Sequence, residues 1–342
     1  MPRNKHKSPE EKTLLALKKY LKGGETIICA VSGGADSVFL LNCLLKFNET
    51  TPIKIVVMHI NHSLRGPEAD MDAEFVKNLA EKHSLTFHCT KVDVTALAES
   101  TKSSLEEIGR EIRYKFGYEL FEQYGAAYVV TAHHADDNLE TILLNFIRGS
   151  GLKGLSGIKV IKQKRNGLKL FRPLLSISKD EIRKFLEEKH IHYKFDQTNL
   201  DTTIPRNFLR YEVIPKLKEF NPNLQKTILK NSQICAEIHE FLKEEAEKWI
   251  EKHNLSENPD SLTKFDLKSI RSLPLPIQKE ILRRIYKRKT GDIKNVTSTH
   301  IDEVLNIINK NIGRKQKRLG EYTVEIQKGT FILRATSKVA LC

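Results

Sequence analysis

A short polar loop, SGGADS at residues 32–37, has the residue types of an anion-binding site. It lies between the apolar run 26–31, which is typical of a buried strand, and residues 37–47, whose apolar spacing is helical. Adjacent glycines allow a turn that points several backbone N–H groups at one centre, and the following helix adds its dipole. The spacing predicts a phosphate cradle, with a plain tight turn and helix cap as the alternative.

The loop lacks the lysine that a Walker-type loop directs at the β- and γ-phosphates of a nucleotide. Asp36 begins the helix instead, and a carboxylate repels a neighbouring phosphate unless a cation lies between them. Asp36 therefore indicates Mg²⁺ on a bound pyrophosphate, while Ser32 and Ser37 offer hydroxyl donors.

A second polar cluster, HHADDNLE, occupies residues 133–140. His133, Asp137 and Glu140 have the spacing of side chains that share one helical face. Carboxylates suit Mg²⁺, and the histidine suits a phosphate contact or proton transfer. The alternative is structural: Asp136 and Asp137 only cap a helix, and Glu140 completes a capping box.

Strand and helix patterns alternate from residue 26 to residue 148 and bring both clusters to one sheet edge. This alternation predicts right-handed βαβ units and an α/β fold with a doubly wound parallel sheet, which binds ligands at the carboxyl ends of its strands. The predicted strands are 26–31, 53–60, 86–92 and 126–132, and the predicted helices are 37–47, 68–83, 103–125 and 136–149.

The character of the sequence changes after residue 150. Residues 149–175 are rich in glycine and lysine and predict loops with a short hairpin at Arg165–Gly167. Within them, GSGLKG matches a dinucleotide fingerprint but follows a helix, so we expect a mobile basic loop near the site. The later predicted elements are helices at 178–190, 223–253, 277–289 and 299–310 and a strand pair at 318–337.

We place a domain boundary at 215/216. Residues 1–215 are predicted to form the nucleotide-binding domain, and residues 216–342 a mainly helical domain with a small terminal β-hairpin.

Composition restricts the partners and the compartment. The 342-residue chain has 57 Lys and Arg against 43 Asp and Glu, a net charge of +14, which favours a nucleic acid partner over a merely solvated basic surface. No apolar run is long enough to span a membrane and the N-terminus has no apolar leader, so we expect a cytoplasmic protein. The five cysteines are scattered singly, which argues against disulfides and zinc.

The SGGADS loop after a first strand resembles that of the PP-loop superfamily of ATP pyrophosphatases, which cleave ATP between the α- and β-phosphates and adenylate a substrate. One family in it, the tRNA(Ile)-lysidine synthases, is similar throughout, densely from about residue 25 to 215. Its motifs here include NHSLRG (61–66), GREIRY (109–114), DQTN (196–199) and PRNFLR (205–210). One departure is Asn138, where the family pattern leads us to expect glutamine.

This resemblance implies a ligase that uses ATP and Mg²⁺. Such an enzyme adenylates C2 of the wobble cytidine in the CAU anticodon of tRNA(Ile), and the ε-amine of free lysine then displaces AMP to give lysidine. The implied partners are that tRNA and lysine, while the oligomeric state, a homodimer included, stays open.

The resemblance also implies roles for individual residues. The loop would hold pyrophosphate, backbone groups near His59 and Asn61 would take the adenine, and Arg113 and His133 would neutralise charge on the α-phosphate. Arg113 is equally typical of an exposed helix arginine. The residues assigned to ATP are Ala30, Ser32, Gly33, Gly34, Asp36, Ser37, His59, Asn61 and His133. Those assigned to Mg²⁺ or the lysine ammonium are Asp36, Asp137 and Glu140, and the catalytic set adds Arg113 and His133.

Basic clusters at 162–165, 283–289 and 314–318 are expected to contact the tRNA backbone, although each alone is typical of a solvated face. For Arg206 and Asn207, helix capping beside Pro205 is the alternative. The residues assigned to tRNA are Lys153, Arg206, Asn207, Arg283, Arg284, Lys287 and Arg288.

Two rival functions remain. A tRNA thiolase of the same superfamily would need paired cysteines, and the scattered cysteines count against it. A non-catalytic RNA- or nucleotide-binding module could lack the acidic site residues, but Asp36, Asp137 and Glu140 are all present.

Overall fold

The chain forms two compact units, residues 1–233 and 234–342, which divide within the helix α11 (Leu224–Lys252). Composition alone places the boundary earlier, at 215/216. The computed structural model describes residues 7–63, 66–102, 104–194, 202–253, 255, 262–291, 293, 296–310 and 316–336. The motif DQTN at 196–199 lies outside the described residues, as do Leu64 and Arg65 of NHSLRG and residues 314–315 of the last basic cluster.

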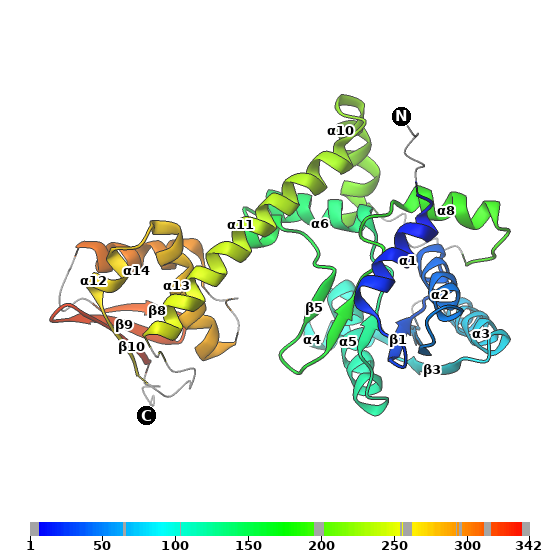
Figure 1. The fold of residues 1–342 in the computed structure, drawn as a ribbon, viewed down its shortest axis with the longest axis horizontal. Coiled ribbons are helices and arrows are strands. Elements are labelled where there is room, and N and C mark those ends of the chain that lie inside the picture. The colour runs from blue at the N-terminus through cyan, green and yellow to red at the C-terminus, as the bar shows by residue number, and fades with distance from the viewer. Residues whose placement is uncertain are drawn as a thin grey trace. The chain divides into compact units, whose positions relative to one another are not determined.

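A single six-stranded sheet forms the centre of the first unit (Figure 1). Its strands are β1 (Thr26–Ala30), β2 (Lys54–Asn61), β3 (Thr86–Lys91), β4 (Tyr128–Val130), β5 (Ile161–Gln163) and β6 (Lys169–Phe171). The spatial order is β3-β2-β1-β4-β6-β5, with every pair parallel except β5–β6. The order reverses between β1 and β4, which is where such sheets bind ligands. The predicted doubly wound parallel sheet is therefore confirmed.

Helices cover both faces of this sheet because its strands are apolar on both sides. In β1, Ile27 and Cys29 pack toward one face, whereas Ile28 packs toward the other. The first face is covered by α1 (Pro9–Tyr20), α2 (Ala35–Asn48), α3 (Pro67–Lys82) and α8 (Lys179–Glu188), and the second by α5 (Leu105–Gln123).

The remaining elements of the first unit lie near the carboxyl edge of the sheet or connect to it. They are α4 (Val94–Thr101), α6 (Ala135–Ile147), α7 (Leu152–Leu155), α9 (Pro205–Phe208), a π-helical turn (Leu209–Val213) and α10 (Ile214–Phe220). The hairpin predicted around Arg165–Gly167 is confirmed as β5–β6. Where a mobile loop was predicted at 149–154, residues 152–155 instead form α7. The sequence analysis missed α1, although Ser8 and Glu11 form its capping box.

The second unit packs helices on a four-stranded antiparallel sheet. It contains the C-terminal part of α11, α12 (Leu267–Arg271), α13 (Leu275–Thr290), α14 (Ser298–Lys310), β7 (Thr263–Asp266), β8 (Gln316–Leu319), β9 (Tyr322–Gln327) and β10 (Thr330–Ala335). The strand order is β7-β10-β9-β8. The predicted terminal strand pair is β9–β10, and two short strands that we did not predict extend it on both sides. Among the described helices of the chain, none combines the length and apolar character that crossing a bilayer requires.

Asn138, the departure from the family pattern, has a structural role in the first unit. Its side chain is 8% exposed, and Oδ1 accepts a hydrogen bond of 2.7 Å from the backbone N–H of Ile158. The adjoining Gly157 has a φ of +67°, and a Cβ there would lie 2.3 Å from Asn138 Oδ1. The amide thus ties α6 to the segment that follows α7, and only glycine leaves room for it.

We expect Gly157→Ala to lower the free energy of unfolding by about 3 kcal/mol, because it combines a strained φ with a clash against Asn138. Gly167→Ala is the matched control: its φ is +86°, but nothing lies within 4 Å of the added Cβ, so about 1 kcal/mol is expected. Urea denaturation followed by circular dichroism measures both. Equal losses would show that the contact between Gly157 and Asn138 has no energetic weight.

Candidate active site

The loop between β1 and α2 has the backbone of an anion cradle. Gly33 has a φ of +92°, which favours glycine, and a Cβ there would lie 3.4 Å from Val76. Ser37 Oγ donates to Gly34 O at 2.9 Å and accepts from Ser32 N at 3.2 Å, which closes the turn. Gly34 is the N-cap of α2 and supplies no side-chain cap. The first N–H groups of α2 therefore have no side-chain cap and are positioned to bind an anion.

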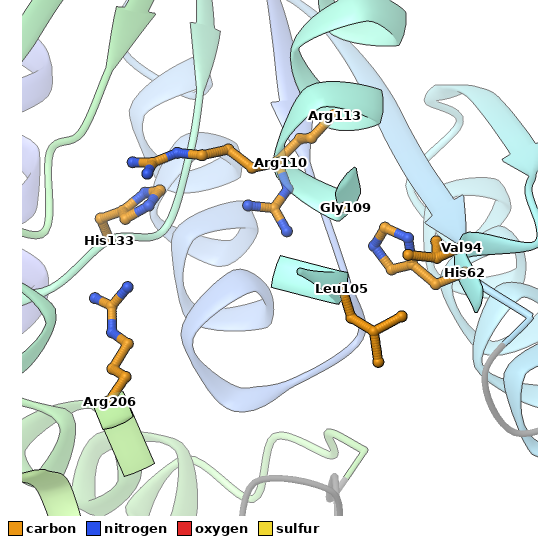
Figure 2. Close-up of a pocket in the computed structure, with 8 residues that line it drawn as sticks. All are labelled: His62, Val94, Leu105, Gly109, Arg110, Arg113, His133 and Arg206. Carbon is orange, nitrogen blue, oxygen red and sulfur yellow. The ribbon is translucent and has the colours of Figure 1, made fainter. Parts of the chain in front are cut away.

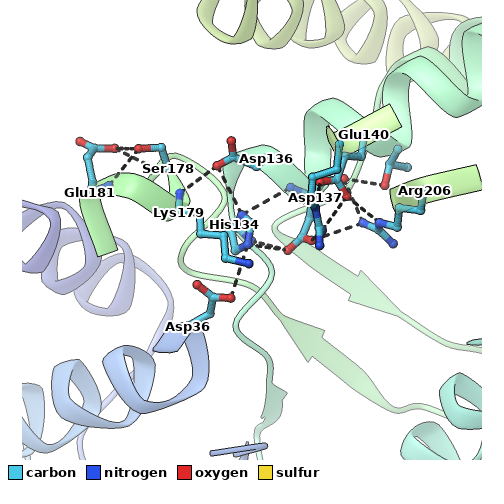
Figure 3. Close-up of polar contacts among 11 residues, drawn as sticks. Asp36, His134, Asp136, Asp137, Glu140, Ser178, Lys179, Glu181 and Arg206 are labelled. Carbon is cyan, nitrogen blue, oxygen red and sulfur yellow. Dashed lines mark hydrogen bonds and ion pairs between the residues drawn. The ribbon is translucent and has the colours of Figure 1, made fainter. Parts of the chain in front are cut away.

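Asp36, in the first turn of α2, faces His134 from the loop after β4 (Figure 3). Asp36 Oδ2 lies 3.5 Å from His134 Nε2, whereas Oδ1 is buried and has no hydrogen-bond partner. A buried carboxylate oxygen without a donor is costly unless a ligand satisfies it. The site therefore offers one unsatisfied anionic oxygen beside the phosphate cradle.

His134 is 2% exposed and lies among three carboxylates. Its Nε2 is 3.5 Å from Asp137 Oδ2, and its Nδ1 is 3.6 Å from Asp136 Oδ2. Burial lowers the pKa of His134, but the contact with Asp36 and the charges of Asp137 and Asp136 raise it more, so the net pKa is above its ordinary 6.5. The carboxylates around His134 thus outweigh the effect of its burial on the pKa.

The helix α6 begins too late in the sequence for His133 to be part of it. Its first residue is Ala135, so His133 lies outside it, and the prediction that His133 shares a helical face with Asp137 and Glu140 is wrong. The N-cap is His134, which forms a capping box with Asp137: each side chain accepts a hydrogen bond from the other residue's backbone N–H. Glu140 takes no part in this box.

Glu140 is instead the centre of a buried ion-pair network (Figure 3). It is 1% exposed; Oε2 accepts from Arg206 Nε at 2.7 Å, and Oε1 accepts from Arg210 Nε at 2.6 Å. Arg210 lies in the π-helical turn, and Glu140 raises its pKa further above the usual range despite its burial. Among the described residues, no three His, Cys, Asp or Glu side chains form a metal-binding group, so the predicted trio with Asp36 and Asp137 does not come together.

A cavity of about 170 Å³ lies beside this network (Figure 2). Among the residues that the structure describes, those that line it include no carboxylate; they are His62, Val94, Leu105, Arg110, Arg113, His133 and Arg206, with Gly109 completing the wall. Arg206 therefore belongs both to the Glu140 network and to this pocket. Three guanidinium groups in one cavity suit an anionic ligand.

Both histidines of the pocket are neutral near pH 7. Burial and the charges of Arg172, Arg113 and Arg206 lower the pKa of His133 to about 3, against the opposing charge of Asp137. Burial, followed by Arg113 and His59, lowers the pKa of His62 to about 4. In this environment His133 is suited to contribute hydrogen bonds to a ligand. Its Nδ1 lies 2.9 Å from Thr131 Oγ1.

Two of the residues assigned to adenine use their side chains to hold the end of β2. The ring of His59 is hydrogen-bonded to Val31 O at 2.8 Å, and Asn61 donates to Asp70 at 2.7 Å. Both side chains are nearly fully buried, so only backbone groups of this strand end stay candidates for a base contact. Ala30 ends β1, Lys153 is exposed on α7, and Asn207 is buried on α9.

The tRNA contacts predicted in the second unit lie on α13, where two are engaged in ion pairs. Arg284 and Arg288 both bind Glu247, and Arg284 Nε also lies 3.1 Å from Glu280. Lys287 is exposed and Arg283 half-buried. The pairing of Arg284 and Arg288 gives them a structural role within this unit.

Sequence reasoning missed several residues of the site. They are His62, Arg110, His134, Arg172 and Arg210. A signal existed for His134, because a polar residue three positions before Asp137 has the spacing of a capping box. Arg206 and Arg210 have i, i+4 spacing, but their common partner on another helix cannot be seen in the sequence.

The family model described as a PP-loop domain matches residues 6–217. The chain belongs to the PP-loop family. Both carboxyl-edge clusters, at 32–37 and 133–140, lie inside the matched region of this PP-loop chain.

Curated relatives extend the similarity beyond the PP-loop domain. The chain is 33% identical over 303 residues to a tRNA(Ile)-lysidine synthase of Caldanaerobacter subterraneus, covering 88% of this chain and 63% of that protein. It is 33% identical over 282 residues to a tRNA(Ile)-lysidine synthase of Geobacter sulfurreducens, covering 82% and 59%. The alignments thus span about three-fifths of the length of these relatives.

A solved structure also shares the fold. The U34-tRNA thiolase of Methanococcus maripaludis superposes with a TM-score of 0.56 and 18% sequence identity, covering 67% of this chain and 78% of that one. At this identity the likeness concerns the PP-loop fold alone.

Because the pKa of His134 is raised, its contribution to stability is fully present below about pH 6.5 and is lost as the pH rises through the folded-state pKa. We expect His134→Gln to destabilise the chain by about 1 kcal/mol or more near pH 6, and by less near pH 9. Urea denaturation at the two pH values measures this. The exposed His192→Gln is the control, and an equal loss for His134→Gln at both pH values would contradict the ionic role.

Replacing Glu140 with glutamine leaves two buried guanidinium groups without their carboxylate. We expect Glu140→Gln to cost about 3 kcal/mol of unfolding free energy. Glu181→Gln is the matched control, because Glu181 pairs with Lys12 at 2.6 Å in a much more exposed position, where less than about 1 kcal/mol is expected. A loss no larger than that of the control would mean that Glu140 is not the structural centre of this network.

Proposed function

We propose that this chain ligates lysine to C2 of the wobble cytidine of the CAU anticodon of tRNA(Ile), through an adenylated tRNA, with release of pyrophosphate and AMP. The observation that carries the proposal is the buried, unsatisfied oxygen of Asp36 beside an anion cradle, in a chain 33% identical to tRNA(Ile)-lysidine synthases. We assign adenylation to residues 1–215 and contacts with the remainder of the tRNA to residues 216–342.

ATP would place its β- and γ-phosphates on the loop at 32–37, where the N-terminus of α2 and the exposed Ser32 hydroxyl are available and Ser37 holds the turn. The donor set fits Mg²⁺, since this ion usually takes only one or two protein carboxylates and completes its shell with phosphate oxygens and water. Asp36 would hold it through Oδ1, with Asp137 as the nearest candidate for a second ligand. When bound, Mg²⁺ supplies neutralisation of the departing pyrophosphate.

The reaction proceeds in two substitutions. The cytidine O2 attacks the α-phosphorus and the bond to the bridging oxygen of pyrophosphate breaks; the lysine ε-nitrogen then attacks C2, and the C2–O bond to AMP breaks. Arg113 and Arg206 line the pocket and would stabilise the negative charge that grows on the α-phosphate. Neutral His133 would donate a hydrogen bond there.

The lysine substrate needs a carboxylate for its ammonium group before the amine reacts. Both oxygens of Glu140 are already occupied by Arg206 and Arg210. Asp137 contacts Arg206 at the longer distance of 3.4 Å, so it is the better candidate. Glu140 then acts through the two arginines that it orients.

The thiolase alternative is disfavoured by the described cysteines. Sulfur transfer needs a reactive thiolate, but burial raises the pKa of both Cys29 and Cys43 to about 12. Cys89 is exposed on β3, and Cys235 lies on α11 in the other unit. A non-catalytic binding module gives no reason to keep Oδ1 of Asp36 buried and unsatisfied next to the cradle.

Asp36→Asn should abolish pyrophosphate release and the incorporation of radiolabelled lysine into bulk tRNA, by at least about 100-fold, while tRNA binding stays intact. The matched control is Asp180→Asn, an exposed aspartate that also lies in the first turn of a helix.

Two results would overturn the proposal. One is the absence of lysine incorporation by the wild-type chain, and the other is AMP formation that requires a sulfur donor. Loss of tRNA binding with normal ATP cleavage in Asp36→Asn would show that Asp36 acts on the RNA instead.

A further inference from the structure

A group of cations surrounds Tyr114 on the side of α5 that faces the β5–β6 hairpin. We call it the Tyr114 cluster, and it consists of Arg110, Tyr114, Lys162, Lys164 and Arg172. Arg110 Nε donates to Tyr114 Oη at 3.2 Å, and Lys164 Nζ lies 4.0 Å from the centre of the tyrosine ring. The geometry of this cluster is set by the fold of the first unit alone.

Two periodicities bring these side chains together. Arg110 and Tyr114 are four residues apart on α5 and therefore share a helical face. Lys162 and Lys164 are two residues apart along the extended β5 strand and its continuation, so they point to the same side of the hairpin. That side faces α5, because Leu168 and Leu170 of the hairpin pack in the same core as Tyr114.

The cluster carries four positive groups and little to balance them. In the part of the chain that the structure describes, no carboxylate lies within 4 Å of Arg110, Lys162 or Lys164. Partial desolvation and the charges of Lys164, Arg172 and Arg110 lower the pKa of Lys162, and only Tyr114 opposes them. The cations therefore repel one another, and an anion bound among them would relieve this repulsion.

Tyr114 and Arg172 hold the other side chains of the cluster in position. Burial raises the pKa of Tyr114, but the hydrogen bond from Arg110 and the nearby cationic charges lower it more. Arg172 is 3% exposed and donates from Nη1 to Lys159 O at 2.9 Å, while its Nε is buried without a partner. The ring of Tyr114 also holds the Lys164 ammonium over its face, which positions that charge before any ligand arrives.

We propose that the Tyr114 cluster is a binding site for a backbone phosphate of the RNA substrate, which it holds beside the arginine-lined pocket. The proposal rests on the proposed function for the identity of the RNA. Arg110 belongs to both the cluster and the pocket, so a phosphate at the cluster lies next to the position of the reacting base (Figure 2). Lys162 and Lys164 do not line the pocket, and they extend the positive surface beyond it.

The test uses the full chain with Lys162→Ala and Lys164→Ala combined. We expect the Kd for tRNA, measured by filter binding at several salt concentrations, to rise about 10-fold, and the dependence of log Kd on log salt to become shallower by about one to two units. The KM for ATP should not change. The matched control is Lys184→Ala with Lys189→Ala, which removes the same charge from exposed positions on and just after α8 and should leave tRNA binding unchanged.

A second variant, Tyr114→Phe, keeps the ring under Lys164 but removes the oxygen that accepts from Arg110. It should weaken tRNA binding about 2- to 3-fold, with an unchanged salt dependence, because the cations remain but Arg110 loses its anchor. An unchanged Kd and salt dependence in the double-lysine variant would overturn the proposal. So would a raised KM for ATP with normal tRNA binding, because the cluster would then serve the nucleotide.

These outcomes are separate from those of the proposed function. Failure of lysine ligation appears as no lysine incorporation by the wild-type chain, whatever the affinity for tRNA. Failure of the cluster appears only in the binding constants of the variants, whatever the reaction catalysed.

Discussion

The contact between His134 and the carboxylates around it connects the two halves of the site. One partner, Asp36, comes from α2 after β1, and the others, Asp136 and Asp137, come from α6 after β4. Asp136 Oδ2 also accepts a hydrogen bond from Lys179 N at the start of α8. A single buried imidazole ring and the carboxylates around it therefore connect the N-termini of three helices, and through them the phosphate loop and the rest of the carboxyl edge.

The neighbours of each buried histidine in the site determine the direction in which its pKa shifts. Where carboxylates surround a histidine, as at His134, its pKa is raised. Where guanidinium groups surround one, as at His133, the neutral form is favoured. The pKa values of two adjacent histidines are thus shifted in opposite directions by their neighbours, and each histidine suits a different task. His134 holds acidic groups in place, whereas the positive charge offered to a ligand comes from arginines whose charge does not depend on pH in this range.

The sequence predicted the parts of the fold and site that depend on local pattern. The buried strands, the glycine turn at 33–34 and the position of Asp36 follow from apolar runs and turn chemistry over a few residues. Which of His133 and His134 contacts the acidic residues depends on where α6 begins, and the sequence does not define a helix start to within one residue. The role of Glu140 depended on arginines about seventy positions later, and β7 and β8 are too short to show a periodic pattern.

The net charge of +14 is a poor guide to where RNA would bind, because it does not show which cations are paired with carboxylates. Arg206 and Arg210 are held by Glu140, and Arg284 and Arg288 are held by Glu247. A guanidinium group already paired with a carboxylate can still contact a ligand directly, as proposed for Arg206, but it adds little to the attraction of a distant polyanion, since the field of the pair falls off quickly. The cations that attract a polyanion most strongly are thus those that lie close together without acidic partners. In the first unit this condition is met on the side of α5 that faces the β5–β6 hairpin, where the fold brings lysines and arginines from two elements onto one tyrosine.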